Sequence, residues 1–210
     1  GNTEGALMDG IENAKHYRAL ANKFHALGFN IVPLGDNKAP VMTIYKGVPS
    51  EYPWGKWKAH KQTDYLFAEM RGEKFWVDVR GVGAITGHVS GDLVCLDFDN
   101  EQPVEVVLQF LNALNLGDDY VWLVRSPGGW HVWVRCPGLT LPDDKGKLVY
   151  WGIQGGKTEL RWVGHQTALP GSVHPSGKLY AWHNAEPTEP PAAVTPDDLM
   201  AAYMAVTNGE

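Results

Sequence analysis

The sequence predicts an α+β fold, in which a mixed, mostly antiparallel sheet is flanked by helices. Apolar residues recur at helical spacing over 11–27 and over 104–114, and a glycine follows shortly after each segment. Strand-like runs joined by glycine-containing turns form two candidate β-hairpins, at 82–99 and at 120–135. Further strand-like segments follow at 148–151, 159–163 and 179–182.

The first part of the chain combines a helix, a strand and a region of weak periodicity. The predicted helix covers 11–27 and ends before Gly28. Segment 29–34 is rich in β-formers and predicts a strand. Residues 41–80 are polar and rich in tryptophan, and we expect one helix there, at 64–70.

The last part of the chain is rich in proline and ends in a short helix. Prolines between residues 186 and 196 indicate a linker, and Pro196-Asp197-Asp198 favours the start of a helix. We therefore expect a main domain at 1–185 and a C-terminal segment at 186–210 that leads to further domains.

Composition excludes several classes of protein. At 210 residues with 44% hydrophobic content, the chain can bury the core of one domain. No apolar stretch approaches the ~20 residues of a membrane span, and no secretory signal is recognisable, so we expect a cytoplasmic protein without membrane contact. Cys95 and Cys136 lie in apolar runs, which favours buried thiols over a disulfide or a zinc site. The net charge of −6 implies that any contact with nucleic acid is local.

Two aspartates at the end of one predicted strand form the first candidate site. Strand alternation points Asp97 and Asp99 to the same face. Their carboxylates repel each other unless a cation lies between them. Mg²⁺ or Mn²⁺ suits such oxygen ligands and can activate a hydroxyl for phosphoryl transfer. The alternative is that both aspartates end the strand and cap the turn that follows.

A glycine turn followed by a histidine forms the second candidate site. The run from Ser126 to His131 contains Gly128 and Gly129. Backbone amides in such turns can face phosphate oxygens, and glycine lets a ligand approach closely. We expect a triphosphate to bind here, with His131 donating a hydrogen bond or a proton to the departing pyrophosphate. The alternative is an ordinary tight turn and a histidine with a local hydrogen bond.

A third acid lies beside a base. Alternation puts Glu159 and Arg161 on one face, where Glu159 can complete the carboxylate set and Arg161 can neutralise a phosphate. The alternative is an exposed ion pair on an edge strand. A later outward-facing loop adds Ser172, His174 and Lys178 as candidate nucleotide-binding residues.

In this order, these motifs resemble the archaeo-eukaryotic primase superfamily, and most of all its bifunctional primase-polymerase, or prim-pol, branch. The motifs are Leu96-Asp97-Phe98-Asp99, the turn from Ser126 to His131, and Glu159 with Arg161. The resemblance covers about residues 14–182, and its supporting segments are 28–34, Lys38 with Pro40, 85–87, 169–172 and 177–180.

The resemblance implies an RRM-like catalytic core that performs template-dependent nucleotidyl transfer in DNA replication, as a DNA primase, a DNA polymerase or both. Asp97, Asp99 and the third acid would hold Mg²⁺ or Mn²⁺, and Ser126 and His131 would contact the phosphates of an NTP or dNTP. The implied partners are a single-stranded DNA template and a helicase domain or protein. The chain departs from the family in having Glu159 where aspartate is more common, and it lacks the cysteine cluster that some prim-pol proteins carry as a zinc stem.

The resemblance also implies a mechanism, to which the residues leave alternatives. Metal ions would lower the pKa of a 3′-hydroxyl, which attacks the α-phosphate and expels pyrophosphate, while Arg161 stabilises charge on the triphosphate. A metal-dependent nuclease or other phosphotransferase would use water or a different acceptor. A noncatalytic nucleic-acid-binding module or an Asp-x-Asp glycosyltransferase is a further alternative.

A primase must also hold a second triphosphate and a template strand, and the sequence offers candidate residues for both. Initiation without a primer requires a second triphosphate, for which Lys38, Arg125 or Lys178 is a candidate contact. Exposed tryptophans can stack template bases, but the spacing of the tryptophans favours the core for most of them. The candidates are Trp54, Trp57, Trp130 and Trp133.

Overall fold

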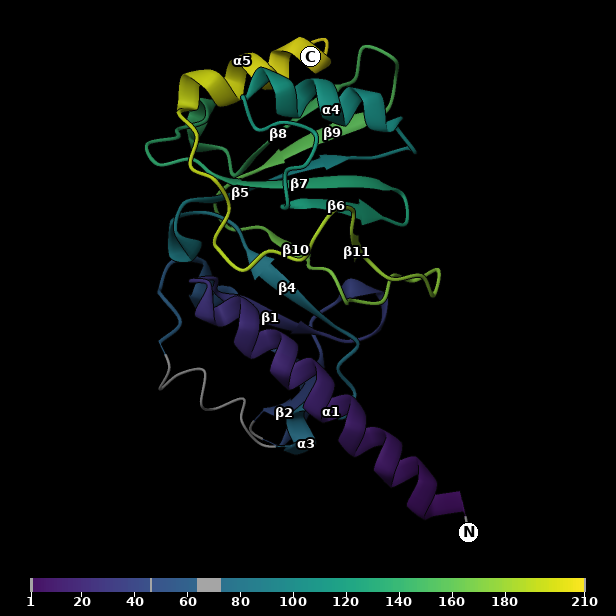
Figure 1. Ribbon diagram of the computed structural model, residues 1–210. Coiled ribbons are helices and arrows are strands. Elements are labelled where there is room, and N and C mark those ends of the chain that lie inside the picture. The colour runs from purple at the N-terminus through teal and green to yellow at the C-terminus, as the bar shows by residue number, and fades with distance from the viewer. Residues whose placement is uncertain (1, 46, 64–72, 210) are drawn as a thin grey trace.

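The protein consists of helices packed on the outer faces of two antiparallel sheets (Figure 1). The computed structural model describes residues 2–45, 47–63 and 73–209. α4 (Val104–Ala113) and α5 (Pro196–Val206) cover the larger sheet, and α1 (Asn2–Ala26) lies against the smaller one. This arrangement confirms the predicted α+β fold class.

The larger sheet has six strands in the order β11-β6-β7-β5-β9-β8, and each neighbouring pair is antiparallel. β6 and β7 form the predicted second hairpin, in which Ser126 lies opposite Gly129. Because β5 is central, both β7 and β9 place side chains directly beside those of β5. The strands are β5 (Leu93–Phe98), β6 (Leu123–Ser126), β7 (Gly129–Arg135), β8 (Lys147–Trp151), β9 (Lys157–Arg161) and β11 (Ala181–Trp182).

The smaller sheet has three strands in the order β1-β4-β10. They are β1 (Ile31–Leu34), β4 (Gly81–Ile85) and β10 (Gln166–Ala168). The prediction of a hairpin at 82–99 is wrong, because β4 and β5 belong to different sheets. The chain passes from one sheet to the other at Gly87, whose φ of 107° suits glycine and whose absent Cβ would lie 2.9 Å from Val163 Cα.

The region between the first strand and β4 forms short elements. β2 (Met42–Tyr45) and β3 (Val48–Glu51) pair as a separate hairpin. The described part of the region also contains 3₁₀ turns (Asp36–Lys38 and Gly55–Lys58) and α3 (Glu73–Trp76). The helix expected at 64–70 lies outside the described residues.

α1 is longer than predicted, because it already begins at Asn2. Its buried side chains recur at helical spacing and face the smaller sheet, which explains why the periodicity is visible in the sequence. They are Ala14, Tyr17, Ala21 and Phe24. None of the described helices has the length and apolar character needed to cross a membrane.

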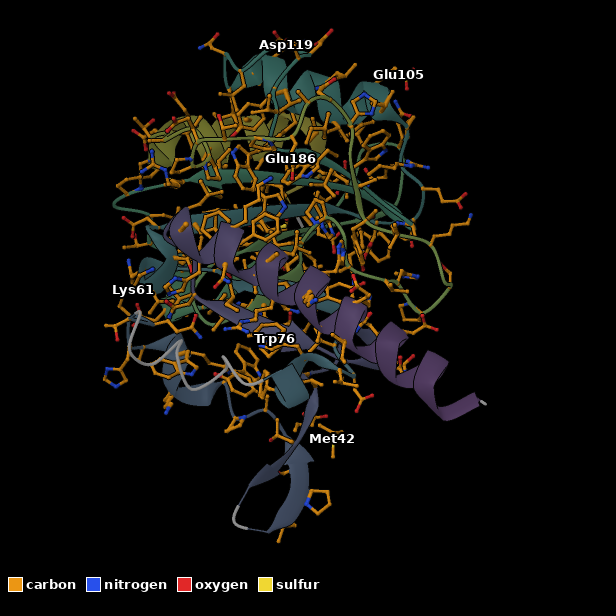
Figure 2. All side chains as sticks on the ribbon, turned by 60° about the horizontal axis from the view of Figure 1, so that its bottom comes forward. Met42, Lys61, Trp76, Glu105, Asp119 and Glu186 are labelled. Carbon is orange, nitrogen blue, oxygen red and sulfur yellow. The ribbon has the colours of Figure 1, made fainter. Side chains whose placement is uncertain are left out.

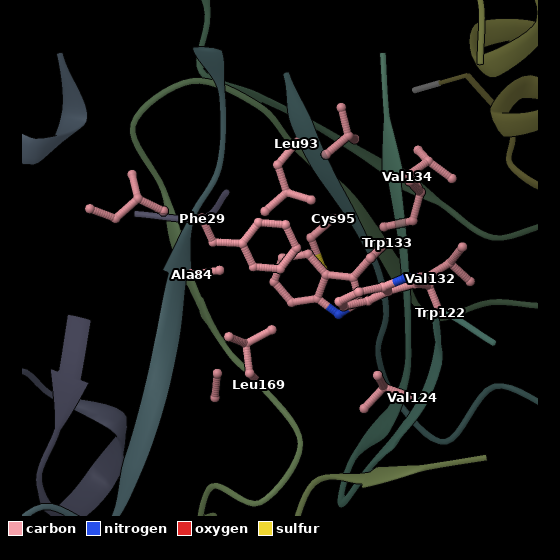
Figure 3. Close-up of a cluster of buried hydrophobic side chains, with 14 of the residues drawn as sticks. Phe29, Ala84, Leu93, Cys95, Trp122, Val124, Val132, Trp133, Val134 and Leu169 are labelled. Atoms are coloured by element: carbon pink, nitrogen blue, oxygen red, sulfur yellow. The ribbon is translucent and has the colours of Figure 1, made fainter. Parts of the chain in front are cut away.

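The two sheets pack face to face through an apolar core (Figure 3). Phe29 meets Trp122 at 5.5 Å between ring centroids, and Cys95 and Trp133 are fully buried beside them. Both cysteines are buried free thiols, as predicted. Most of the tryptophans predicted for the core are there, since Trp57, Trp130 and Trp133 are buried and Trp54 is half-buried.

The opposite face of the larger sheet packs on α4 and α5. Phe98 meets Phe110 of α4 at 5.6 Å between ring centroids, and the Tyr203 hydroxyl of α5 donates a hydrogen bond to the Leu148 carbonyl at 3.2 Å. The proline-rich segment that precedes α5 runs beside the end of β7, where Val194 N donates to the Arg135 carbonyl at 2.8 Å. α5 is thereby held on the same core as the rest of the sheet.

Candidate functional site

Three polar side chains form one row across the larger sheet. Strand register places Asp97 of β5 between His131 of β7 and Glu159 of β9. Residues directly opposite each other in antiparallel strands point to the same face, with Cβ atoms about 4.5–5.5 Å apart. All three are buried. The structure therefore brings together two of the predicted acids and the predicted histidine.

A pocket of about 450 Å³ opens over this row, between the two sheets. Asp97, Glu159 and His131 form its floor. The opposite wall comes from residues around Lys38 and from β10 of the smaller sheet. The row therefore faces a half-open pocket of a size that suits a small-molecule ligand.

Asp97 and Asp99 lie beside each other in different environments. Burial raises the pKa of the Asp97 carboxyl, but the neighbouring His131 and Arg161 outweigh this effect and hold the pKa at about 2. Burial and the charge of Asp97 both raise the pKa of Asp99, which lies just beyond the end of β5 and is half-buried. The charge of Asp97 therefore opposes the ionisation of Asp99, as expected from their spacing.

Arg161 bridges the two buried acids of the row. Its Nη2 donates to Asp97 Oδ2 at 2.6 Å, and its Nε donates to Glu159 Oε2 at 2.9 Å. Its Nη1 donates to Thr167 Oγ1 of β10 at 2.8 Å, which ties the two sheets together. Burial by itself lowers the pKa of Arg161, but the charges of Asp97 and Glu159 raise it by more. The net effect is a raised pKa, so the guanidinium stays charged. Arg161 therefore neutralises the acids in this structure.

His131 lies between Asp97 and an aromatic ring. Its Nε2 is 3.3 Å from Asp97 Oδ1, and its ring stacks on Tyr180 at 5.6 Å between centroids. Its Nδ1 is buried and has no hydrogen-bond partner among the described residues. A buried nitrogen without a partner in a pocket wall is available to a ligand.

The glycine turn contributes its first half to the pocket. Ser126 and Gly128 line it, and a Cβ at Gly128 would meet no atom within 4 Å. Gly129 was predicted to contact the nucleotide but does not line the pocket. A Cβ there would lie 1.8 Å from the Phe98 carbonyl oxygen, so Gly129 serves the close packing of β7 against the end of β5.

Residues 21–197 match the family model for the N-terminal domain of bifunctional DNA primase/polymerases, Prim-Pol. The chain belongs to the Prim-Pol family. The match confirms the resemblance noted in the motifs, and it contains every residue of the pocket lining. No curated protein matches the chain. At the level of the family, the function is nucleotidyl transfer of the DNA primase/polymerase type.

The divalent cation implied by the prim-pol resemblance fits part of the predicted ligand set. Asp97 Oδ1 is buried and makes no well-formed hydrogen bond among the described residues, since its contact with His131 Nε2 is 3.3 Å long, and Asp99 lies next to it. Glu159 differs, because its Oε2 accepts from Arg161 and its Oε1 is 3.0 Å from Lys157 Nζ. Within the described part of the chain, no three His, Cys, Asp or Glu side chains converge as a ready metal site. The aspartate pair thus fits a cation, whereas Glu159 is held in ion pairs.

Cations line the sides of the Prim-Pol pocket. Lys38 and Lys147 join Arg161 there, and the histidines His165 and His174 lie among them. Burial lowers the pKa of both histidines. The charges of Lys147 and Arg161 lower the pKa of His165 further, and the charge of Lys38 does the same for His174. The pocket therefore combines a carboxylate floor with cationic sides, which suits a metal–phosphate ligand.

Several lining residues were not predicted from the sequence. Gln166 and Thr167 belong to β10, and Gln166 Nε2 donates to the Lys38 carbonyl at 3.1 Å across the pocket wall. Gln166 Oε1 is buried without a hydrogen-bond partner among the described residues. The one available signal was the polar run from His165 to Thr167 between two apolar segments.

Ser172 and Lys178 do not join His174 in the pocket lining. The buried Ser172 hydroxyl accepts from Val82 N at 2.9 Å and donates to the Val82 carbonyl at 3.2 Å, so it fixes the loop to β4. Lys178 is exposed, and Arg125 lies over the Trp130 ring at 4.6 Å. Of the cations suggested for a second triphosphate, only Lys38 lines this pocket.

Proposed function

We propose that this domain catalyses template-dependent nucleotidyl transfer from nucleoside triphosphates, as a DNA primase, a DNA polymerase or both. The observation that supports this best is the row of Asp97, His131 and Glu159 on the floor of a pocket with cationic sides. Carboxylates hold divalent cations and cations hold phosphates, so the pocket has a place for each part of a metal-bound triphosphate.

Asp97 and Asp99 would hold Mg²⁺ or Mn²⁺, because Asp97 Oδ1 makes no well-formed hydrogen bond among the described residues and a second carboxylate lies beside it. When bound, the ion would lower the pKa of an attacking 3′-hydroxyl and stabilise the leaving oxygen. Glu159 remains the proposed third ligand, and this role requires it to exchange its contact with Arg161.

The other pocket residues would bind and orient the triphosphate. Ser126 and the open space at Gly128 admit phosphate oxygens, and the charge of Lys38 offsets theirs. His131 would donate a hydrogen bond or a proton to the departing pyrophosphate, since its Nδ1 has no partner among the described residues. Arg161 is the cation nearest to the acids and would stabilise the charge that develops between them and the phosphates.

An incorporation assay tests this proposal. The domain is incubated with a primed single-stranded DNA template, with each nucleotide class and with Mg²⁺ or Mn²⁺. We expect product growth that depends on the template and that falls by more than about 100-fold in Asp97→Asn. Asp119→Asn is the matched control, because Asp119 is exposed and lies in the turn that follows α4 (Figure 2).

Two results would contradict the proposal. Shortening of the nucleic acid without growth would favour a nuclease. Growth that is equal in Asp97→Asn and Asp119→Asn would mean that the pocket is not the active site.

A further inference from the structure

The face of the larger sheet that carries the site continues onto its edge strand, β8. Strand register pairs Lys147 with Arg161, Val149 with Glu159, and Trp151 with Lys157. Opposite residues of antiparallel strands share a face, so these three β8 side chains extend the rows of the site by one strand. Edge strand β8 therefore forms a shelf beside the pocket.

Trp151 is the one exposed tryptophan of the shelf and of the chain. All nine tryptophans fall within the described residues, and the other eight are buried or half-buried, whereas Trp151 is 55% exposed. An exposed tryptophan ring beside a polar site offers an aromatic face on which a nucleic-acid base can stack.

The backbone holds Trp151 in place from both sides. β9 pairs with it at Lys157, and on its other edge Asn208 N donates to the Trp151 carbonyl at 2.8 Å. An aromatic side chain on a fixed backbone loses little conformational entropy when a ligand stacks on it. The ring is therefore presented as a preformed platform.

The platform lies close to the catalytic aspartates. Asp99 N donates to the Lys157 carbonyl at 2.9 Å, and Lys157 pairs with Trp151, so the three residues follow each other across three adjacent strands. Neighbouring strands are about 4.8 Å apart, which puts the Trp151 backbone roughly 10 Å from that of Asp99. A nucleotide at the aspartates and a base on Trp151 would be near neighbours along one strand.

Cations accompany the aromatic ring on β8. A hollow of about 640 Å³ follows the strand, is lined by Lys145, Lys147, Val149 and Tyr150 among others, and shares Lys147 and His165 with the site pocket. Lys147 and Lys157 expose 45% and 41% of their side chains on the site face. Both lysines also contact Glu159 Oε1, at 3.9 Å and 3.0 Å, but the Glu159 side chain is only 7% exposed, so the charges that this surface presents to solvent are those of the lysines.

We propose that this face of β8 binds the single-stranded DNA strand that enters the active site, with a base stacked on Trp151 and phosphates against Lys147 and Lys145. An aromatic ring flanked by cations is the arrangement that holds single-stranded nucleic acid without sequence preference. The assignment rests on the proposed function, because it takes DNA as the partner of the same site.

Equilibrium binding of a short fluorescein-labelled single-stranded DNA, followed by anisotropy at low salt, tests the assignment. The assay contains no triphosphate and no divalent ion, so its result is independent of catalysis. Trp151→Ala should weaken binding roughly 5- to 100-fold. Trp151→Phe should retain most of the affinity, whereas Trp151→Leu, which is apolar but has no aromatic face, should not.

Two further variants complete the test. Met42→Ala is the control, because Met42 is 61% exposed on the separate β2–β3 hairpin (Figure 2) and should bind like the wild type. Lys147→Gln should reduce the slope of log affinity against log salt by about 0.7, the value for one phosphate contact on a single strand.

Equal binding by Trp151→Ala and Met42→Ala, or by Trp151→Leu and Trp151→Phe, would overturn the assignment, as would a wild type that does not bind the DNA. The two proposals fail separately. Normal incorporation with DNA binding that ignores Trp151 would refute only the role of β8, and Trp151-dependent binding without any incorporation would refute only the proposed catalysis.

Discussion

Replacement of Gly129 by alanine tests how closely the glycine turn packs on the strand that carries the aspartates. The added Cβ would lie 1.8 Å from the Phe98 carbonyl oxygen and 2.9 Å from its carbon. These are backbone atoms, which cannot rotate away, so β5 and β7 must separate next to Asp99. Such overpacking costs about 1–3 kcal/mol, which for a chain of this length lowers the Tm by roughly 2–12 °C.

Gly128→Ala is the matched control for this prediction. A Cβ at Gly128 meets no atom within 4 Å, so the free energy of unfolding should stay within about 0.5 kcal/mol of the wild type. Because Gly128 lines the pocket, the same methyl group should weaken triphosphate binding. Thermal denaturation followed by circular dichroism, with a triphosphate titration, measures both effects. A Tm for Gly129→Ala equal to that of Gly128→Ala would refute the packing argument.

Three further predictions follow from the site. The depressed pKa of Asp97 means that its charge adds stability above the ordinary aspartate pKa, and that this stability is lost as the pH falls towards about 2. In EDTA, the Tm of Asp97→Asn should therefore fall less than that of the wild type between pH about 4 and about 2. An identical fall in Tm would argue against a depressed pKa of Asp97. Ser172→Ala should lower the free energy of unfolding by about 1–3 kcal/mol in urea while keeping triphosphate affinity, because its hydroxyl holds Val82; unchanged stability with lost affinity would contradict this. Lys38→Gln should weaken binding of a fluorescent triphosphate by about 10-fold or more, and Lys178→Gln should not. An equal loss of affinity in the two variants would mean that the loop with Lys178 also binds the triphosphate.

The sequence predicts the parts of the site that depend on strand alternation and on motif order. Asp97 and Asp99 were expected on one face from their spacing alone, and the turn from Ser126 to Gly129 was expected to join two strands. Both features are local, because alternation and tight turns are properties of a few consecutive residues. Alternation with Arg161 already made Glu159 a candidate third acid, but only the prim-pol resemblance linked it to Asp97, because no local rule shows which strands pair.

The sequence does not predict the parts that depend on how the two sheets meet. The strand-like runs around Gly87 have the pattern of a hairpin, and nothing local shows that they pair in different sheets. Lys38 and Gln166 are 128 positions apart and meet only because β10 and the segment after β1 lie on the same wall. Ser172 and His174 lie in a loop, and a loop has no fixed alternation of side chains. The sequence therefore could not show which of the two side chains faces the pocket.

The most direct test of the central claim is a crystal structure with Mn²⁺ and a non-hydrolysable nucleoside triphosphate. The account predicts anomalous density for manganese at Asp97 and Asp99, and phosphates between Ser126, Lys38 and His131. Manganese elsewhere, or a triphosphate bound outside this pocket, would contradict it.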